Sequence, residues 1–120
     1  MDIRTKRVYE PINPRDGLRI LVDRVWPRGM TKAQVQADRW LKDVAPSTAL
    51  RKWFGHDRLK WRAFKDRYFS ELDAKPETME ALIDEAVKGR LTLLFSARDI
   101  ECNQAVALRE HLLARFEERT

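Results

Sequence analysis

Two runs of charged and polar residues carry the side chains best suited to chemistry, and each follows an apolar segment. They span positions 23–28 and 96–103. Arginine's planar fork suits bidentate binding of phosphate or carboxylate, and a carboxylate can take or give a proton. The candidates are Asp23, Arg24, Trp26, Arg28, Ser96, Arg98, Asp99 and Asn103. We therefore expect an anion site in which Asp23 or Asp99 handles a proton or a hydroxyl group.

Two further features fit the same site. Arg51 adds a guanidinium group to those of the two runs. A helix expected to begin near Thr31 would point its free backbone amide groups toward an anion held there. The sequence thus predicts that several arginines and one helix end share one ligand.

Each of these residues also has a purely structural explanation. Asp99 can cap the last helix, and Asp23 can form an ion pair with Arg24 or Arg98. Trp26 can belong to the core, and the turn after it can simply end a strand. Because polar residues gather after two strands together, we favour a functional role for the cluster.

His56 is a second candidate for catalysis, as a general acid or base oriented by Asp57. Adjacent residues seldom face each other, however, and Asp57 suits the cap of the next helix. Cys102 is either a nucleophile near a strand end or a buried free thiol. It has no partner cysteine, and the other histidine, His111, is distant in sequence. We expect no metal site and, without a glycine-rich phosphate loop, no cofactor.

The elements that must position these residues alternate between strands and helices. Strands are expected at 3–9, 18–25 and 91–95, and helices begin near Thr31, Ser47, Asp57 and Pro76, with a last helix ending near Glu118. The second and third strands are apolar on both faces, which is typical of a parallel sheet covered on both sides. We predict a small single α/β domain with a mainly parallel sheet flanked by helices, in a Rossmann-like three-layer arrangement. In such sheets ligands bind at the carboxyl ends of the strands.

The connection between the first two predicted strands is too short for a helical crossover. It contains Pro11, Pro14 and the pair Asp16-Gly17, which favour turns. These two strands are therefore either antiparallel neighbours or not neighbours at all.

Charge is unevenly distributed along the 120 residues. The net charge is +5, and residues 1–70 hold 17 Lys and Arg against 8 Asp and Glu. Such a basic half can attract phosphate, nucleic acid or an acidic partner, or it can simply solvate helix surfaces. The single cysteine, the lack of an apolar leader and the short apolar runs predict a cytoplasmic protein that does not enter membranes. They leave the oligomeric state open.

Long motifs in these regions resemble the YeaO-like branch of the family called domain of unknown function 488. They match in order over nearly the whole chain, at 16–29, 40–42, 45–47, 50–57, Trp61, Phe64, Tyr68, 93–99 and Asn103. The resemblance implies one cytoplasmic α/β domain over residues 1–120, in a family without an established activity. Members commonly have histidine after the asparagine that matches Asn103, whereas this chain has Gln104. The difference favours hydrogen bonding or packing there over proton transfer.

Two functional hypotheses follow. The first is a site for an anionic small molecule, such as a nucleotide or another phosphorylated compound, whether or not the protein is an enzyme. The alternative is a nucleic-acid-binding or regulatory module that uses the basic first half. Trp26 is the one tryptophan outside the apolar helix patterns and therefore the one free to stack on a base.

Overall fold

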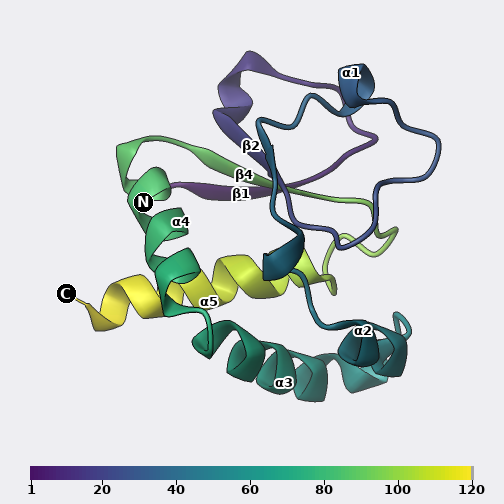
Figure 1. Cartoon of the computed structure of the whole chain (residues 1–120), viewed down its shortest axis with the longest axis vertical. Helices are drawn as coiled ribbons and strands as arrows, with labels where there is room; N and C mark the ends of the chain where they lie inside the picture. The colour runs from purple at the N-terminus through teal and green to yellow at the C-terminus, as the bar shows by residue number, and fades with distance from the viewer. Residues whose placement is uncertain (120) are drawn as a thin grey trace.

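A four-stranded sheet organises residues 1–119, the part of the chain that the computed structural model describes. Its strands, in spatial order, are β1 (Ile3–Arg7), β4 (Leu91–Phe95), β2 (Leu18–Leu21) and β3 (Arg39–Trp40) (Figure 1). Every pairing is parallel, with Ile20 opposite Leu93 and Leu21 opposite Leu94. The prediction of an α/β fold with a mainly parallel sheet is confirmed.

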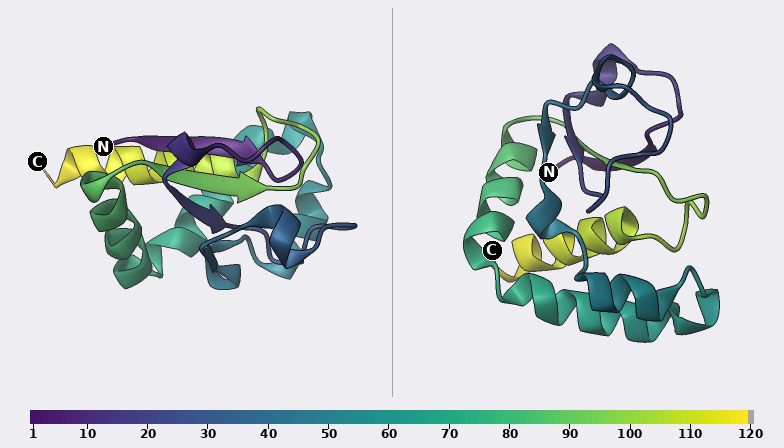
Figure 2. Two further views of the ribbon diagram at one scale, coloured as in Figure 1. Left: turned by 90° about the horizontal axis from the view of Figure 1, so that it is seen from above. Right: turned by 45° about the vertical axis from the view of Figure 1, so that its right-hand side comes forward.

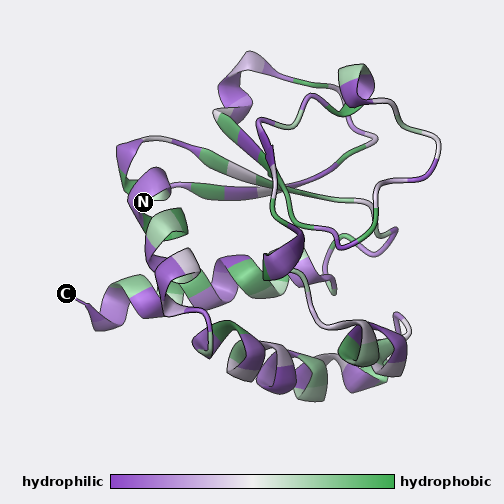
Figure 3. Cartoon of the chain, in the orientation of Figure 1, coloured by the Kyte–Doolittle hydropathy of each residue, from purple (hydrophilic) through white to green (hydrophobic). Residues whose placement is uncertain are grey.

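One face of the sheet carries the main core and the longer helices. These are α2 (Thr48–Phe54), α3 (Trp61–Asp73), α4 (Pro76–Lys88) and α5 (Gln104–Glu118). Their apolar residues recur at helical spacing between hydrophilic ones (Figure 3). Ile20, Leu93 and Phe95 of the sheet are buried against them. None of the helices within residues 1–119 is long and apolar enough to cross a membrane.

The other face is covered mostly by irregular chain. Leu21 and Leu94, one step along each strand from the residues of the main core, pack there with Val8 and Val35. Val35 ends α1 (Lys32–Val35), a single helical turn on the opposite side of the sheet from α3 and α5 (Figure 1 and Figure 2). The three layers are therefore unequal, with loops and one short helix forming the second cover.

Local sequence signals fix where the helices begin. Thr31 and Gln34 form a capping box at the start of α1, and Ser47 caps α2, so both helices begin where the sequence predicts. Asp57 caps a short 3₁₀ turn (Arg58–Lys60) that leads into α3, rather than α3 itself. Asn103, not Asp99, is the N-cap of α5, so the idea that Asp99 caps the last helix is wrong.

The sheet resolves the open question about the first two strands. β1 and β2 are not neighbours, because β4 lies between them and pairs with both. β1 ends at Arg7 and β2 at Leu21, earlier than expected, although the Val22 amide still donates to the Leu94 carbonyl at 3.1 Å. β3 has only two residues and no alternating pattern, which explains why the sequence did not reveal it.

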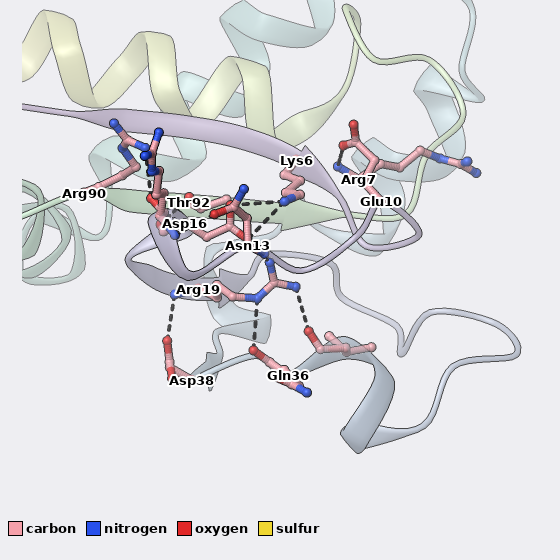
Figure 4. Close-up of polar contacts among 12 residues, drawn as sticks. Lys6, Arg7, Glu10, Asn13, Asp16, Arg19, Gln36, Asp38, Arg90 and Thr92 are labelled. Carbon is pink, nitrogen blue, oxygen red and sulfur yellow. Dashed lines mark hydrogen bonds and ion pairs between the residues drawn. The ribbon is translucent and has the colours of Figure 1, made fainter.

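A buried ionic cluster fills the second face beside β2 (Figure 4). Asp16 accepts hydrogen bonds from three donors: Lys6 Nζ at 3.1 Å, Arg19 Nη1, and the backbone amide of Asn13 at 3.1 Å. Arg19 also donates to the carbonyls of Val35 and Gln36. We call Lys6, Asn13, Asp16 and Arg19 the Asp16 network. It ties the turn before β2 to the chain that follows α1.

Candidate functional site

A cavity of about 610 Å³ opens where β2 and β4 end. Four stretches line it: the turn after β2, residues 45–46, the end of α2 with part of α3, and the turn between β4 and α5. All ten predicted site residues are among the lining: Asp23, Arg24, Trp26, Arg28, Arg51, His56, Ser96, Arg98, Asp99 and Asn103. Parallel strands place both runs at one edge, as expected for this fold class.

Asp23 is the buried acid of the cavity, only 6% exposed. Its carboxylate accepts hydrogen bonds from the Ser96 amide at 3.0 Å and from the Gln104 side-chain amide. Burial raises the pKa of Asp23, while the bonds from Ser96 and Gln104 and the charge of Arg51 offset part of that effect. No ion pair joins Asp23 to Arg24 or Arg98 within residues 1–119, so that structural explanation is wrong.

Gln104 joins the site although it was not among the predicted site residues. It follows the N-cap of α5 and thereby faces the end of β2. A carboxylate accepts only, so the Gln104 group at Asp23 is its NH₂. The signal in the sequence was its place directly after Asn103, in a run of polar residues.

The four arginines of the cavity fall into two kinds. Arg24 is half-buried and donates to the backbone carbonyls of Pro46 at 2.9 Å and Ala45 at 3.2 Å. Arg28, Arg51 and Arg98 are exposed, and their guanidinium groups have no hydrogen-bond or ion-pair partner in the described chain. Arg24 therefore holds the wall in place, whereas the guanidinium groups of the other three make no bond to the described chain.

Asp99 is committed to structure. Arg58 binds its carboxylate in a bidentate ion pair at 2.7 and 2.8 Å, and the amides of Glu101 and Cys102 donate to the same group at 3.0 Å. The hydrogen bond from Arg58 is the main reason that the pKa of Asp99 falls to about 2. A carboxylate held this way stays ionised near neutral pH and is a poor proton carrier.

Asn103 also serves the fold at the edge of the cavity. Its side-chain oxygen accepts from the Val106 amide at 3.1 Å, and its NH₂ donates to the Asp99 carbonyl at 2.9 Å. The residue is buried. These bonds fix the turn between β4 and α5, so Asn103 shapes the cavity through that turn.

Trp26 is anchored rather than free. Its indole NH donates to the Met30 carbonyl at 2.6 Å, and its ring meets Trp40 edge-on with centroids 5.2 Å apart. Trp40 lies in β3, so it too stands outside the apolar helix patterns, contrary to the expectation that Trp26 alone did so. Anchoring of this kind leaves little freedom for stacking on a nucleic-acid base.

His56 sits exposed at the edge of the cavity in an uncommon backbone conformation. Its φ is +58°, after Gly55 at +54°. The centroid of its ring lies 6.3 Å from that of Phe54.

The backbone amides of α1 are not part of the lining, so the expected contribution of that helix end to the site is wrong.

The apolar part of the lining was not predicted. It consists of Val25, Ala45, Pro46, Phe54, Phe64 and Ala97 beside Trp26. Phe54 and Phe64 are buried in the main core. No local pattern in the sequence showed that two core phenylalanines also border a cavity.

These features define a small α/β protein with one parallel sheet and a cationic cavity at its carboxyl edge. The family model described as the inactive DUF488-N3 subclade matches residues 2–120. The chain belongs to this family, domain of unknown function 488, which confirms the resemblance seen in the motifs.

Relatives of known sequence agree with that assignment. The chain is 43% identical to the uncharacterized protein YeaO of Escherichia coli over 112 residues, which cover 93% of this chain and 97% of YeaO. It is 49% identical to the uncharacterized protein Rv3073c of Mycobacterium tuberculosis over 70 residues, 58% of this chain and 59% of that protein. No solved structure matches the chain significantly.

Proposed function

We propose that the cavity at the carboxyl edge of the sheet binds an anionic small molecule that carries a phosphate or carboxylate group. The observation that carries the proposal is that Arg28, Arg51 and Arg98 border one cavity with no acceptor of their own in the described chain. A guanidinium group without an acceptor in the protein can donate its hydrogen bonds to a phosphate or carboxylate of a ligand.

The lining favours binding over catalysis. Asp99 is held ionised by Arg58, and two of the lone-pair positions of Asp23 are taken by Ser96 and Gln104. The matching family model is itself described as an inactive subclade. We therefore propose a binding site, with Asp23 as a buried acceptor rather than a proton-transfer group.

The contacts of Trp26 also favour a small molecule over a nucleic acid. A strand-binding surface needs aromatic rings that can stack on successive bases along a basic groove. Here the Trp26 ring is packed on Trp40 and bonded to Met30. The free arginines instead surround one cavity.

Isothermal titration calorimetry with inorganic phosphate tests the proposal directly. We expect saturable binding by the native protein and at least tenfold weaker binding by the double variant Arg51→Gln/Arg98→Gln. The matched control is Arg62→Gln/Lys88→Gln, which removes the same charge from exposed positions outside the cavity. At 100 times its dissociation constant, a ligand adds about 2.7 kcal/mol to the free energy of unfolding, which a thermal shift detects.

Equal losses in both double variants would show a diffuse effect of net charge and would overturn the proposal. So would tight, steeply salt-dependent binding of single-stranded DNA that the cavity variant leaves unchanged, because it would place the anion site elsewhere.

A further inference from the structure

The lining residues of the cavity fall into two groups by burial, which we take as its mouth and its inner end. The cationic side chains Arg28, Arg51 and Arg98 are exposed and mark the mouth. Phe54 and Phe64, at 6% and 2% exposure, belong to the inner end. A ligand that fills the whole cavity therefore meets positive charge outside and apolar surface within.

The inner end is aromatic and closely packed. The rings of Phe54 and Phe64 stack with centroids 4.3 Å apart, and Trp61 and Tyr68 extend the cluster at 5.7 and 5.6 Å from Phe64. Pro46, whose carbonyl is held by Arg24, adds a further apolar surface without conformational freedom. Such a wall binds a flat apolar group at little cost in ordering.

The inner end also repels anions. Asp23 is another buried residue of the lining and, when ionised, places negative charge in the interior of the cavity. Arg51 offsets this charge only in part, and the guanidinium group of Arg24 is bonded to the carbonyls of Ala45 and Pro46 instead. An anionic group is thus favoured at the mouth and disfavoured inside, which orients an amphipathic ligand.

We infer that the ligand is an aromatic phosphomonoester, bound with its ring against Phe54 and Phe64 and its phosphate among Arg28, Arg51 and Arg98. This inference rests on the proposed anion-binding function. The volume of about 610 Å³ agrees with it, because small-molecule sites of about 300–1,000 Å³ enclose most of an organic ligand. Inorganic phosphate alone would leave the apolar inner end empty.

Calorimetric titration of the native protein with phenyl phosphate, inorganic phosphate and phenol tests the inference. We expect phenyl phosphate to bind about 10- to 100-fold more tightly than inorganic phosphate, because its ring loses contact with water. Phenol should bind more weakly than phenyl phosphate by at least tenfold. The double variant Arg51→Gln/Arg98→Gln should weaken both phosphates and leave phenol unchanged.

The substitution Ala97→Leu adds a second arm, because Ala97 is a half-buried residue of the lining. It should weaken phenyl phosphate at least tenfold and change the affinity for inorganic phosphate less than twofold. Circular dichroism and the melting temperature establish that this variant is folded. The ligand series on the native protein decides the question even where this variant fails to fold.

The outcomes separate the two proposals. Equal affinity for phenyl phosphate and inorganic phosphate, both sensitive to the arginine variant, overturns the aromatic ligand and keeps the anion site. Phenol as tight as phenyl phosphate, with no effect of the arginine variant, overturns both. Binding of neither phosphate at millimolar concentration also overturns both.

Discussion

The Asp16 network and the cavity each combine a buried aspartate with arginines, yet they differ in how those charges are used. Asp16 bonds to Lys6, Arg19 and the Asn13 amide, and Arg19 is itself saturated by backbone carbonyls. In the cavity, Asp23 bonds to neutral donors, and three arginines bond to nothing in the described chain.

The charges of the Asp16 network stabilise the fold, whereas the three arginines of the cavity have no partner within the described residues. A buried ion pair with its hydrogen bonds complete contributes to the fold, and removing one partner leaves the other charge stranded. Unpaired arginines at a cavity mouth contribute nothing comparable. The same residue types thus hold the structure together in one region and line the proposed site in the other, and only their partners distinguish the two.

The largest expected effect comes from removing the central carboxylate of the Asp16 network. Asp16→Ala should lower the free energy of unfolding by about 3 kcal/mol, because it leaves the buried Arg19 and the half-buried Lys6 without their counter-ion. Urea denaturation followed by circular dichroism measures the change.

The control for that change is Asp2→Ala. Asp2 forms ion pairs with Arg4 and Arg90, but its side chain is 41% exposed. Water screens ion pairs between exposed side chains, so the loss of stability should be the smaller of the two. Equal losses of stability in the two variants would show that burial does not determine how much the Asp16 network adds to the free energy of unfolding.

Sequence reasoning predicted the cavity better than it predicted the network. Strands that are apolar on both faces indicate a parallel sheet, and a parallel sheet brings the ends of β2 and β4 to one edge. Asp23 and Ser96 could be placed together on that argument alone. Asp16 looked like a turn residue, because its pairing with Lys6 depends on β1 and β2 being separated by β4.

What the sequence could not supply was the partner of each side chain. Arg24 and Arg28 look alike in sequence, and only the path of residues 45–46 shows that Arg24 is bonded to backbone. Asp99 looked like a cap or an acid until Arg58, forty-one positions earlier, was found on its carboxylate. Such pairings are set by tertiary packing, which local patterns do not record.

The second expected effect is a difference in stability between variants of two arginines that line the cavity. Arg24→Ala should lower the free energy of unfolding by about 2 kcal/mol, since it removes donors from the carbonyls of Ala45 and Pro46. Arg28→Ala should change it by less than about 0.5 kcal/mol, because that side chain is exposed and unbonded within residues 1–119. Urea denaturation of both variants measures the contrast. If Arg28→Ala lowered the free energy of unfolding as much as Arg24→Ala, Arg28 would have a structural role like that of Arg24, which would contradict the distinction between them.

The smallest expected effect is an opposite pH dependence at the two aspartates. Burial raises the pKa of Asp16, but the Asn13 amide, Lys6 and Arg19 outweigh burial and hold this pKa below its usual value of 3.8. Its carboxylate therefore adds stability above the unfolded-state pKa, and that stability is lost as the pH falls through the folded-state value. Burial leaves the pKa of Asp23 raised, so the folded state keeps that proton longer than the unfolded state, and stability falls as the pH rises from 3.8 through the folded-state value.

The variants Asp16→Asn and Asp23→Asn measure these two pH dependences, because asparagine keeps the shape of the side chain but does not titrate. In urea denaturation between pH 3 and pH 7, the stability of the native protein relative to Asp16→Asn should grow with pH. Relative to Asp23→Asn it should shrink with pH over the same range, most steeply at the acid end. Two differences that grow together would mean that Asp23 is paired as Asp16 is. The positive charges at the cavity mouth would then already be engaged by this carboxylate, and the region would be a second closed network rather than an open site.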